Sequence, residues 1–274
     1  MRLPIFHVDA FAETVFQGNP AAVVPLDAWL SDAVMRSIAA ETNLPVTAFL
    51  VACTDGWELR WFTPTVELDL CGHATLAAAY VLSRHLAPGR TSYLFRARTA
   101  GGVVVDVEEG AGGRLVLDFP SRPPIPTEPH PDLLPALGGP PPVEVLRAAG
   151  KYMVVYPDEA AVRALRPQFA DPAGPDGCGV VVTAPASGGG WTDRVHFVSR
   201  YFTPANGMDE DPVTGSTHCL LVPYWAERLG LSRLEARQVS ARGGALSCVL
   251  AGERVRIGGR AALYLEGTIH VPSA

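Results

Sequence analysis

The sequence predicts an α+β protein of two pseudo-symmetric domains, each a curved β-sheet or barrel around a central buried helix. The first observation is an internal repeat, because the pattern Arg-aromatic-Phe-Thr-Pro occurs at 60–64 and again at 200–204. Each copy continues through a short acidic segment to a glycine, Gly72 or Gly215, that precedes an apolar run. Two copies about half a chain apart indicate a duplicated domain rather than a solenoid.

The second observation is a pair of helices that are apolar on every side. Neither the run that follows Gly72 nor the run that follows Gly215 carries a charged residue in its first two turns. A helix that is apolar all round must be buried on all sides. We therefore expect central helices over 72–86 and 215–229.

The third observation is the number of short apolar or alternating runs that have the length of a strand. The clearest candidates are residues 4–11, 20–26, 47–52, 58–62, 114–119, 152–156, 179–184, 255–259 and 261–267. A further helix is expected over 31–44, where Ser31 can cap the first turn and Asn43 with Pro45 can end the last. So many strands beside two buried helices favour a sheet that curves around each helix.

Proline marks the boundary between the domains. Ten of the 25 prolines fall in residues 120–142, and proline neither donates to a sheet ladder nor fits a helix interior. We expect an N-terminal domain over 1–120, a proline-rich linker over 121–142 and a C-terminal domain over 143–261. A last strand near 262–274 can return to the first domain.

Composition and charge exclude several classes of protein. A chain of 274 residues with 48 % hydrophobic and 18 % charged residues can bury two cores. The net charge of -6 and the lack of a Lys/Arg cluster argue against a nucleic-acid partner. The sequence has neither a signal-peptide pattern nor an apolar run of bilayer length. Five cysteines without C-x-x-C spacing fit a reducing compartment, so we expect a cytoplasmic protein that binds no membrane.

The starts of the two apolar helices predict an anion site. A helix N-terminus presents unpaired N–H groups and the positive end of the helix dipole. Two such ends facing each other between the domains would hold a small anion, most simply a carboxylate. Gly72 and Gly215 leave the backbone open to close approach there, although ordinary turn glycines would give the same pattern.

Four residues are candidates for acid–base chemistry, and each also has a purely structural interpretation. Glu41 lies at the C-terminal end of its helix, where the dipole disfavours an anion; this suits a general base, and a solvated helix end is the alternative. His73 at a helix start favours a neutral imidazole that can relay a proton, but a capping or core histidine fits equally. Asp211 and Ser216 suit the same work and are also preferred helix caps.

Other kinds of site are disfavoured. No lysine follows Gly215 as it would in a phosphate-binding loop, and there is no Gly-x-Ser-x-Gly elbow of a serine hydrolase. No histidine stands at ligand spacing from Asp209 or Asp211, so we expect no metal. The remaining acidic residues of the two repeats are expected to be solvated: Glu67, Asp69, Asp209 and Glu210.

Several long motifs, in order, resemble the phenazine-biosynthesis PhzF-like family of isomerases, which is related in fold to diaminopimelate epimerase. These motifs are FHVDAFAETVFQGNPAAVV, ETNLPVTAFLV, FTPTVELDLCGHATLAAA, SRYFTPANGMDEDPVTGSTHC and ARQVSARGG. The resemblance implies two diaminopimelate epimerase-like domains with an active site between them. It also implies that no cofactor is needed and that the protein is a homodimer.

The same resemblance assigns roles to residues. The family's catalytic glutamate falls on Glu41, and the histidine of its Gly-His motif falls on His73. The aspartate and serine of its Glu-Asp-Pro-x-Thr-Gly-Ser motif fall on Asp211 and Ser216. The residues that would bind substrate are Asn19, Gly72, Thr214 and Gly215.

One departure from the related racemases bears on the reaction. Racemases of this fold use two cysteines, one before each central helix, whereas here Cys71 occupies the first place and Thr214 the second. A two-cysteine racemase is therefore disfavoured, and Cys71 is either a small buried residue or a thiol near the site. We expect a cofactor-independent isomerase that moves a proton within a small carboxylate-bearing substrate. The alternative is a non-catalytic member of the family that binds a metabolite or a protein.

Overall fold

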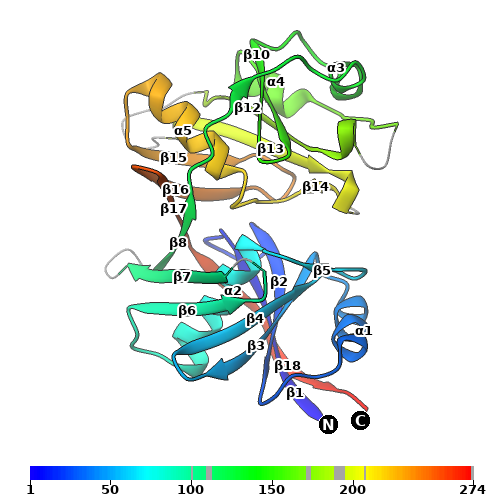
Figure 1. The fold of residues 1–274 in the computed structure, drawn as a ribbon, viewed down its shortest axis with the longest axis vertical. Coiled ribbons are helices and arrows are strands. Elements are labelled where there is room, and N and C mark those ends of the chain that lie inside the picture. Colours follow the sequence, from blue (N-terminus) through cyan, green and yellow to red (C-terminus); the bar gives the residue numbers. More distant parts are fainter. Residues whose placement is uncertain (100, 109–112, 171–173, 188–194, 207, 273–274) are drawn as a thin grey trace. The chain divides into compact units, whose positions relative to one another are not determined.

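The chain folds into two compact units (Figure 1). A computed structural model describes residues 1–99, 101–108, 113–170, 174–187, 195–206 and 208–272. Unit 1 comprises Met1–Asp118 together with Gly258–Ala274, and unit 2 comprises Phe119–Ile257. The strand expected near 262–274 is β18 (Ala261–His270), and it pairs antiparallel with β1 (Arg2–Ala10) in unit 1. Residues 273–274 of that expected strand lie outside the described residues.

Unit 1 wraps its strands around one central helix (Figure 1). Besides β1 and β18, its elements are β2 (Asn19–Leu26), α1 (Asp32–Thr42), β3 (Val46–Cys53), β4 (Gly56–Phe62), β5 (Glu67–Leu68), α2 (Gly72–Val81), η1 (Leu82–Leu86), β6 (Ser92–Ala97), β7 (Gly101–Glu108) and β8 (Arg114–Pro120). α2 contacts β1, β2, β3, β7 and β18, and its residues from His73 to Ala79 are all buried. It is the central helix expected over 72–86, except that its last turn, η1, is π-helical.

α1 shows how local sequence sets the ends of an element. The Oγ of Ser31 accepts a hydrogen bond from the backbone N–H of Val34 at 3.4 Å. Asn43 adopts the left-handed conformation, and its N–H donates to the carbonyl of Ala39 at 3.1 Å. Both are common ways of satisfying the polar groups at helix ends. The predicted helix and both of its cap residues are confirmed.

Unit 2 repeats this order of elements. They are β9 (Ile125–Pro126), α3 (Leu133–Leu137), β10 (Glu144–Ala148), β11 (Lys151–Val155), α4 (Glu159–Ala164), η2 (Pro175–Gly177), β12 (Gly179–Pro185), β13 (Phe197–Thr203), η3 (Pro204–Asn206), β14 (Met208–Asp211), α5 (His218–Leu229), β15 (Arg233–Gln238), β16 (Gly244–Ala251) and β17 (Arg254–Gly259). From β10 to β16 the strands pair in the same sequence of antiparallel and parallel neighbours as from β1 to β7. α4 stands in the place of α1, and α5 in that of α2.

The second central helix begins later than we expected. α5 starts at His218, whereas the sequence indicated a start at Gly215. The intervening residues form a tight turn in which the N–H of His218 donates to the carbonyl of Gly215 at 3.0 Å, and that of Cys219 to the carbonyl of Ser216 at 3.3 Å. Such 3₁₀-type bonds are frequent at helix N-termini. The helix itself is buried from His218 to Ala226, as expected.

The proline-rich segment that we expected to be a linker is packed into unit 2. Its Ile125 and Pro126 form β9, which pairs antiparallel with β10. Leu133 and Leu137 of α3 are fully buried in the core of the unit. Burying a leucine side chain contributes roughly 1.5–3 kcal/mol. The two leucines therefore anchor a segment that its prolines alone would leave as a loop.

The repeated Arg-aromatic-Phe-Thr-Pro segment forms the same contact in each unit. The guanidinium of Arg60 donates two hydrogen bonds to the carboxylate of Glu67, both at 2.7 Å. Arg200 donates to Glu210 in the same way, at 2.8 and 2.9 Å. We expected both glutamates to be solvated: Glu67 is exposed as expected, whereas Glu210 is half-buried, and each carboxylate pairs with a buried guanidinium. The two aspartates are exposed as expected, Asp69 and Asp209.

Within the described residues, no helix is both long and apolar enough to cross a bilayer.

Candidate active site

His73 is a buried, neutral histidine in the first turn of α2. Its Nδ1 lies 3.2 Å from the Nδ2 of Asn19 and 3.4 Å from the Sγ of Cys71. Because an amide nitrogen only donates, Nδ1 accepts, and the ring proton resides on Nε2. Burial lowers the pKa of His73 to about 3. The imidazole can therefore donate from Nε2 at neutral pH without carrying a charge.

A constrained turn places Asn19 beside this histidine. Gly18 has a φ of +66°, and a Cβ there would lie 2.1 Å from the carbonyl oxygen of Ala10, so the turn requires glycine. Phe16 also has a positive φ of 73°, and its N–H donates to the carboxylate of Asp9 at 2.8 Å. Ala10 and Asn19 are partners across the β1–β2 pair. The turn thus delivers a fully buried amide to the start of α2.

Glu41 lies in the last turn of α1 and is exposed. The parallel register of β2 and β3 pairs Ala21 with Val46. The chain that leaves α1 therefore enters β3 at the end of the sheet where β2 begins with Asn19. The register consequently brings the C-terminal end of α1 to the same end of the unit 1 sheet as Asn19. Because the amide of Asn19 contacts His73, this is also the end of the sheet at which His73 lies.

In unit 2, Asp211 and Thr214 form a buried pair just before α5. The hydroxyl of Thr214 donates to Oδ2 of Asp211 at 2.5 Å. The carbonyl of Thr214 accepts from the hydroxyl of Thr217 at 2.9 Å and lies 2.8 Å from Nδ1 of His218. Asp211 is 6 % exposed and Thr214 is 7 % exposed. A carboxylate that accepts from a buried hydroxyl is held in one orientation.

The eight candidate residues thus fall into two groups. Gly215 and Ser216 lie in the turn between Asp211 and α5, where Gly215 is buried and Ser216 is half-buried. Gly72 opens α2 in the corresponding place. Unit 1 therefore holds Asn19, Glu41, Gly72 and His73, and unit 2 holds Asp211, Thr214, Gly215 and Ser216. Three polar residues that contact this second group were not singled out from the sequence: Thr217, His218 and Gln238.

The two buried histidines predict how stability depends on acid. Burial lowers the pKa of His73 to about 3 and that of His218 to about 4, whereas an unfolded histidine titrates near 6.5. Between these values the folded state binds fewer protons, so the free energy of unfolding falls as the pH drops from about 6.5 to 4. The melting temperature should fall over this range, and less steeply in His73→Gln. An identical slope in that variant would contradict the assignment.

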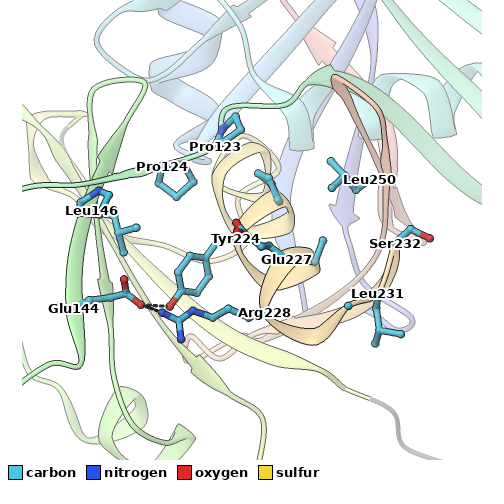
Figure 2. A pocket seen from close by; sticks show the side chains of 14 residues that line it. Pro123, Pro124, Glu144, Leu146, Tyr224, Glu227, Arg228, Leu231, Ser232 and Leu250 are labelled. Carbon is cyan, nitrogen blue, oxygen red and sulfur yellow. Dashed lines mark hydrogen bonds and ion pairs between the residues drawn. The ribbon is translucent and has the colours of Figure 1, made fainter.

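A separate groove of about 840 Å³ lies along α5 in unit 2 (Figure 2). Tyr224 and Arg228 both donate to the carboxylate of Glu144 at its edge. None of the eight candidate residues, all of which the structure describes, lines this groove. Within the described part of the chain, His, Cys, Asp and Glu side chains form no group of three or more that could hold a metal ion.

The sequence matches the family model described as phenazine biosynthesis-like protein (PhzC-PhzF) over residues 8–267. It is 50 % identical over 271 residues to an uncharacterized isomerase of Pseudomonas aeruginosa. The alignment covers 99 % of this chain and 100 % of that protein. It is 39 % identical over 271 residues to an uncharacterized isomerase of Halalkalibacterium halodurans, covering 98 % of this chain and 99 % of that protein.

Solved structures share the fold. A PhzF family protein of Enterococcus faecalis superposes with a TM-score of 0.91 at 43 % identity, covering 99 % of this chain and 100 % of that one. A hydroxyproline epimerase of Agrobacterium vitis, solved with trans-4-hydroxy-L-proline, gives a TM-score of 0.60 at 12 % identity, covering 98 % of this chain and 92 % of that one. The second likeness concerns the fold alone. The two-domain epimerase-like fold predicted from the sequence is confirmed.

Proposed function

Because the chain belongs to the phenazine biosynthesis-like (PhzC-PhzF) family, we propose that it is an isomerase that moves a proton within a small carboxylate-bearing substrate. Two of its relatives are described as uncharacterized isomerases, and it shares its fold with a hydroxyproline epimerase. Acid–base side chains of this chain carry out the chemistry, without a cofactor.

One observation carries the proposal. A buried central helix occurs in both units, and a different kind of proton-handling group lies in its first turn in unit 1 and in the strand before it in unit 2. In unit 1 this group is His73, neutral and hydrogen-bonded through Nδ1. In unit 2 it is the carboxylate of Asp211, buried and bound by a hydroxyl. A pair of groups with such different environments suits proton donation at one atom and acceptance at another.

The roles follow from the chemistry of each group. Glu41 takes a proton from an activated carbon of the substrate and returns it to another carbon, so that the C–H bond that breaks is replaced by one that forms. His73 and Asp211, with Ser216, orient the substrate and relay protons, and each proton given to the substrate is matched by one taken from it. N–H groups at the start of a central helix bind the carboxylate and stabilise the negative charge that develops.

The substrate class can be tested with pooled carboxylate metabolites. The protein is incubated with the pool in D2O, and mass spectrometry identifies any compound that gains carbon-bound deuterium only when the protein is present. We expect a small carboxylate to gain one deuteron and to be joined by an isomer of the same composition. If no compound exchanges with the active-site residues intact, the non-catalytic alternative is favoured instead.

A further inference from the structure

A glutamine from a distant strand holds the turn before α5. Gln238 is the last residue of β15 and is 1 % exposed. Its Oε1 accepts from the backbone N–H of Thr214 at 2.9 Å, and its Nε2 donates to the carbonyl of Asp211 at 2.6 Å. Nε2 also lies 3.4 Å from Oγ1 of Thr214. One side chain therefore fixes the backbone at both ends of the segment 211–214.

The register of the sheet explains this meeting. One edge of β13 is occupied by β12. The other edge pairs with β15 along its first half, where Ser199 faces Gln238, and with β14 along its second half, where Tyr201 faces Asp211. β15 and β14 thus follow one another along the same edge. Gln238, the last residue of β15, therefore lies beside Asp211 of β14.

Unit 1 shows that a buried central helix forms without this network. By the same register and the same repeat, the equivalents of Asp211, Thr214 and Gln238 are Leu68, Cys71 and Ala97. Leucine and alanine side chains carry no hydrogen-bonding atoms. α2 nevertheless begins directly after its turn and is buried. The network in unit 2 is therefore not required for a buried central helix, and it occurs in the copy that carries a carboxylate at the position of Asp211.

We propose that Gln238 is a positioning residue for Asp211 in the proton transfer, an inference that rests on the proposed function. Its amide holds the Thr214 backbone and directs an N–H toward Oγ1 of Thr214. The hydroxyl hydrogen of Thr214 is then left for the carboxylate of Asp211. Chains of hydrogen bonds of this kind strengthen one another in a buried site. Gln238 acts only through these two residues and handles no proton of the substrate.

The test uses the full-length chain, labelled with ¹³C at the aspartate carboxyl carbons, and NMR. Gln238→Met keeps a long side chain but removes the amide. Thr183→Val is the matched control, because Thr183 is a buried residue of the same unit whose hydroxyl accepts from Trp225 at 3.0 Å and donates to Val198 at 2.7 Å. In Gln238→Met, the amide hydrogen of Thr214 should exchange with solvent about tenfold faster, as for one lost buried hydrogen bond. The carboxyl signal of Asp211 should also titrate at a different pH.

Each outcome decides the proposal. Unchanged exchange at Thr214 and unchanged titration of Asp211 in Gln238→Met would overturn it, as would equal changes in Thr183→Val. These signals need no substrate, so they stand or fall separately from the isomerase proposal. Once a substrate is known, Gln238→Met should lower kcat at least tenfold with little change in KM. Wild-type kcat in a variant whose Thr214 amide is deprotected would refute the positioning role and leave the isomerase intact.

Discussion

Replacing Glu41 with glutamine should abolish most turnover while leaving the fold intact. Glutamine keeps the shape of the side chain but accepts no proton at neutral pH. The loss should be about 10²–10⁴-fold in kcat, the usual contribution of a positioned acid–base group. Because Glu41 is exposed and lies at the C-terminal end of α1, removing its charge should leave the melting temperature unchanged or slightly raised.

The matched control is Asp32→Asn, at the other end of the same helix. Asp32 pairs with Arg60 at 2.9 Å and stands where the dipole favours an anion. This variant should lower the melting temperature and leave turnover near the wild-type rate. Normal turnover in Glu41→Gln would remove the general-base role from Glu41 and pass it to His73 or Asp211.

Replacing Asp211 with asparagine should cause a loss of similar size. The amide oxygen can still accept from the hydroxyl of Thr214, so the turn should keep its geometry. The side chain can no longer take up or release a proton, and kcat should fall by about 10²–10⁴-fold. Turnover, substrate affinity and melting temperature are measured together on the purified variant.

Asp209→Asn serves as the control for Asp211, because it neutralises an exposed carboxylate on the same strand. This change should leave all three measurements near the wild-type values. If both variants lose activity equally, the effect is one of charge at the surface of β14. The buried carboxylate would then have no special role.

The sequence was sufficient wherever a local pattern and the core agreed. Ser31 and Asn43 mark the two ends of α1, and both could be predicted because caps act within one turn of the chain. The repeat at 60–64 and 200–204 revealed the duplication, since each copy forms the same pair of a buried arginine and a glutamate. The apolar runs after Gly72 and Gly215 identified the central helices, because only burial explains a helix without a polar face.

Features that depend on distant partners were missed. β15 has the sequence Arg-Leu-Glu-Ala-Arg-Gln. Its three charged residues are exposed and alternate with buried ones, so the segment does not form an apolar run that would have indicated a strand. Gln238 at its end gave no local signal, because its importance comes from Asp211 and Thr214 on another strand and turn. The start of α5 was misplaced because a 3₁₀-type turn precedes the helix, as is frequent at helix N-termini. The pairing of Glu67 and Glu210 with arginine was missed because each arginine is brought beside its glutamate only in the folded sheet.

The most direct test of the account is the fate of one proton. With a substrate found in the metabolite pool, the reaction is run in D2O with wild-type protein, Glu41→Gln and Asp211→Asn, and the product is analysed by NMR and mass spectrometry. The account predicts an isomer of the substrate, with carbon-bound deuterium at a carbon other than the one that lost its proton, formed by the wild type and nearly absent with either variant. A product of different composition, or equal deuterium incorporation by all three proteins, would contradict it.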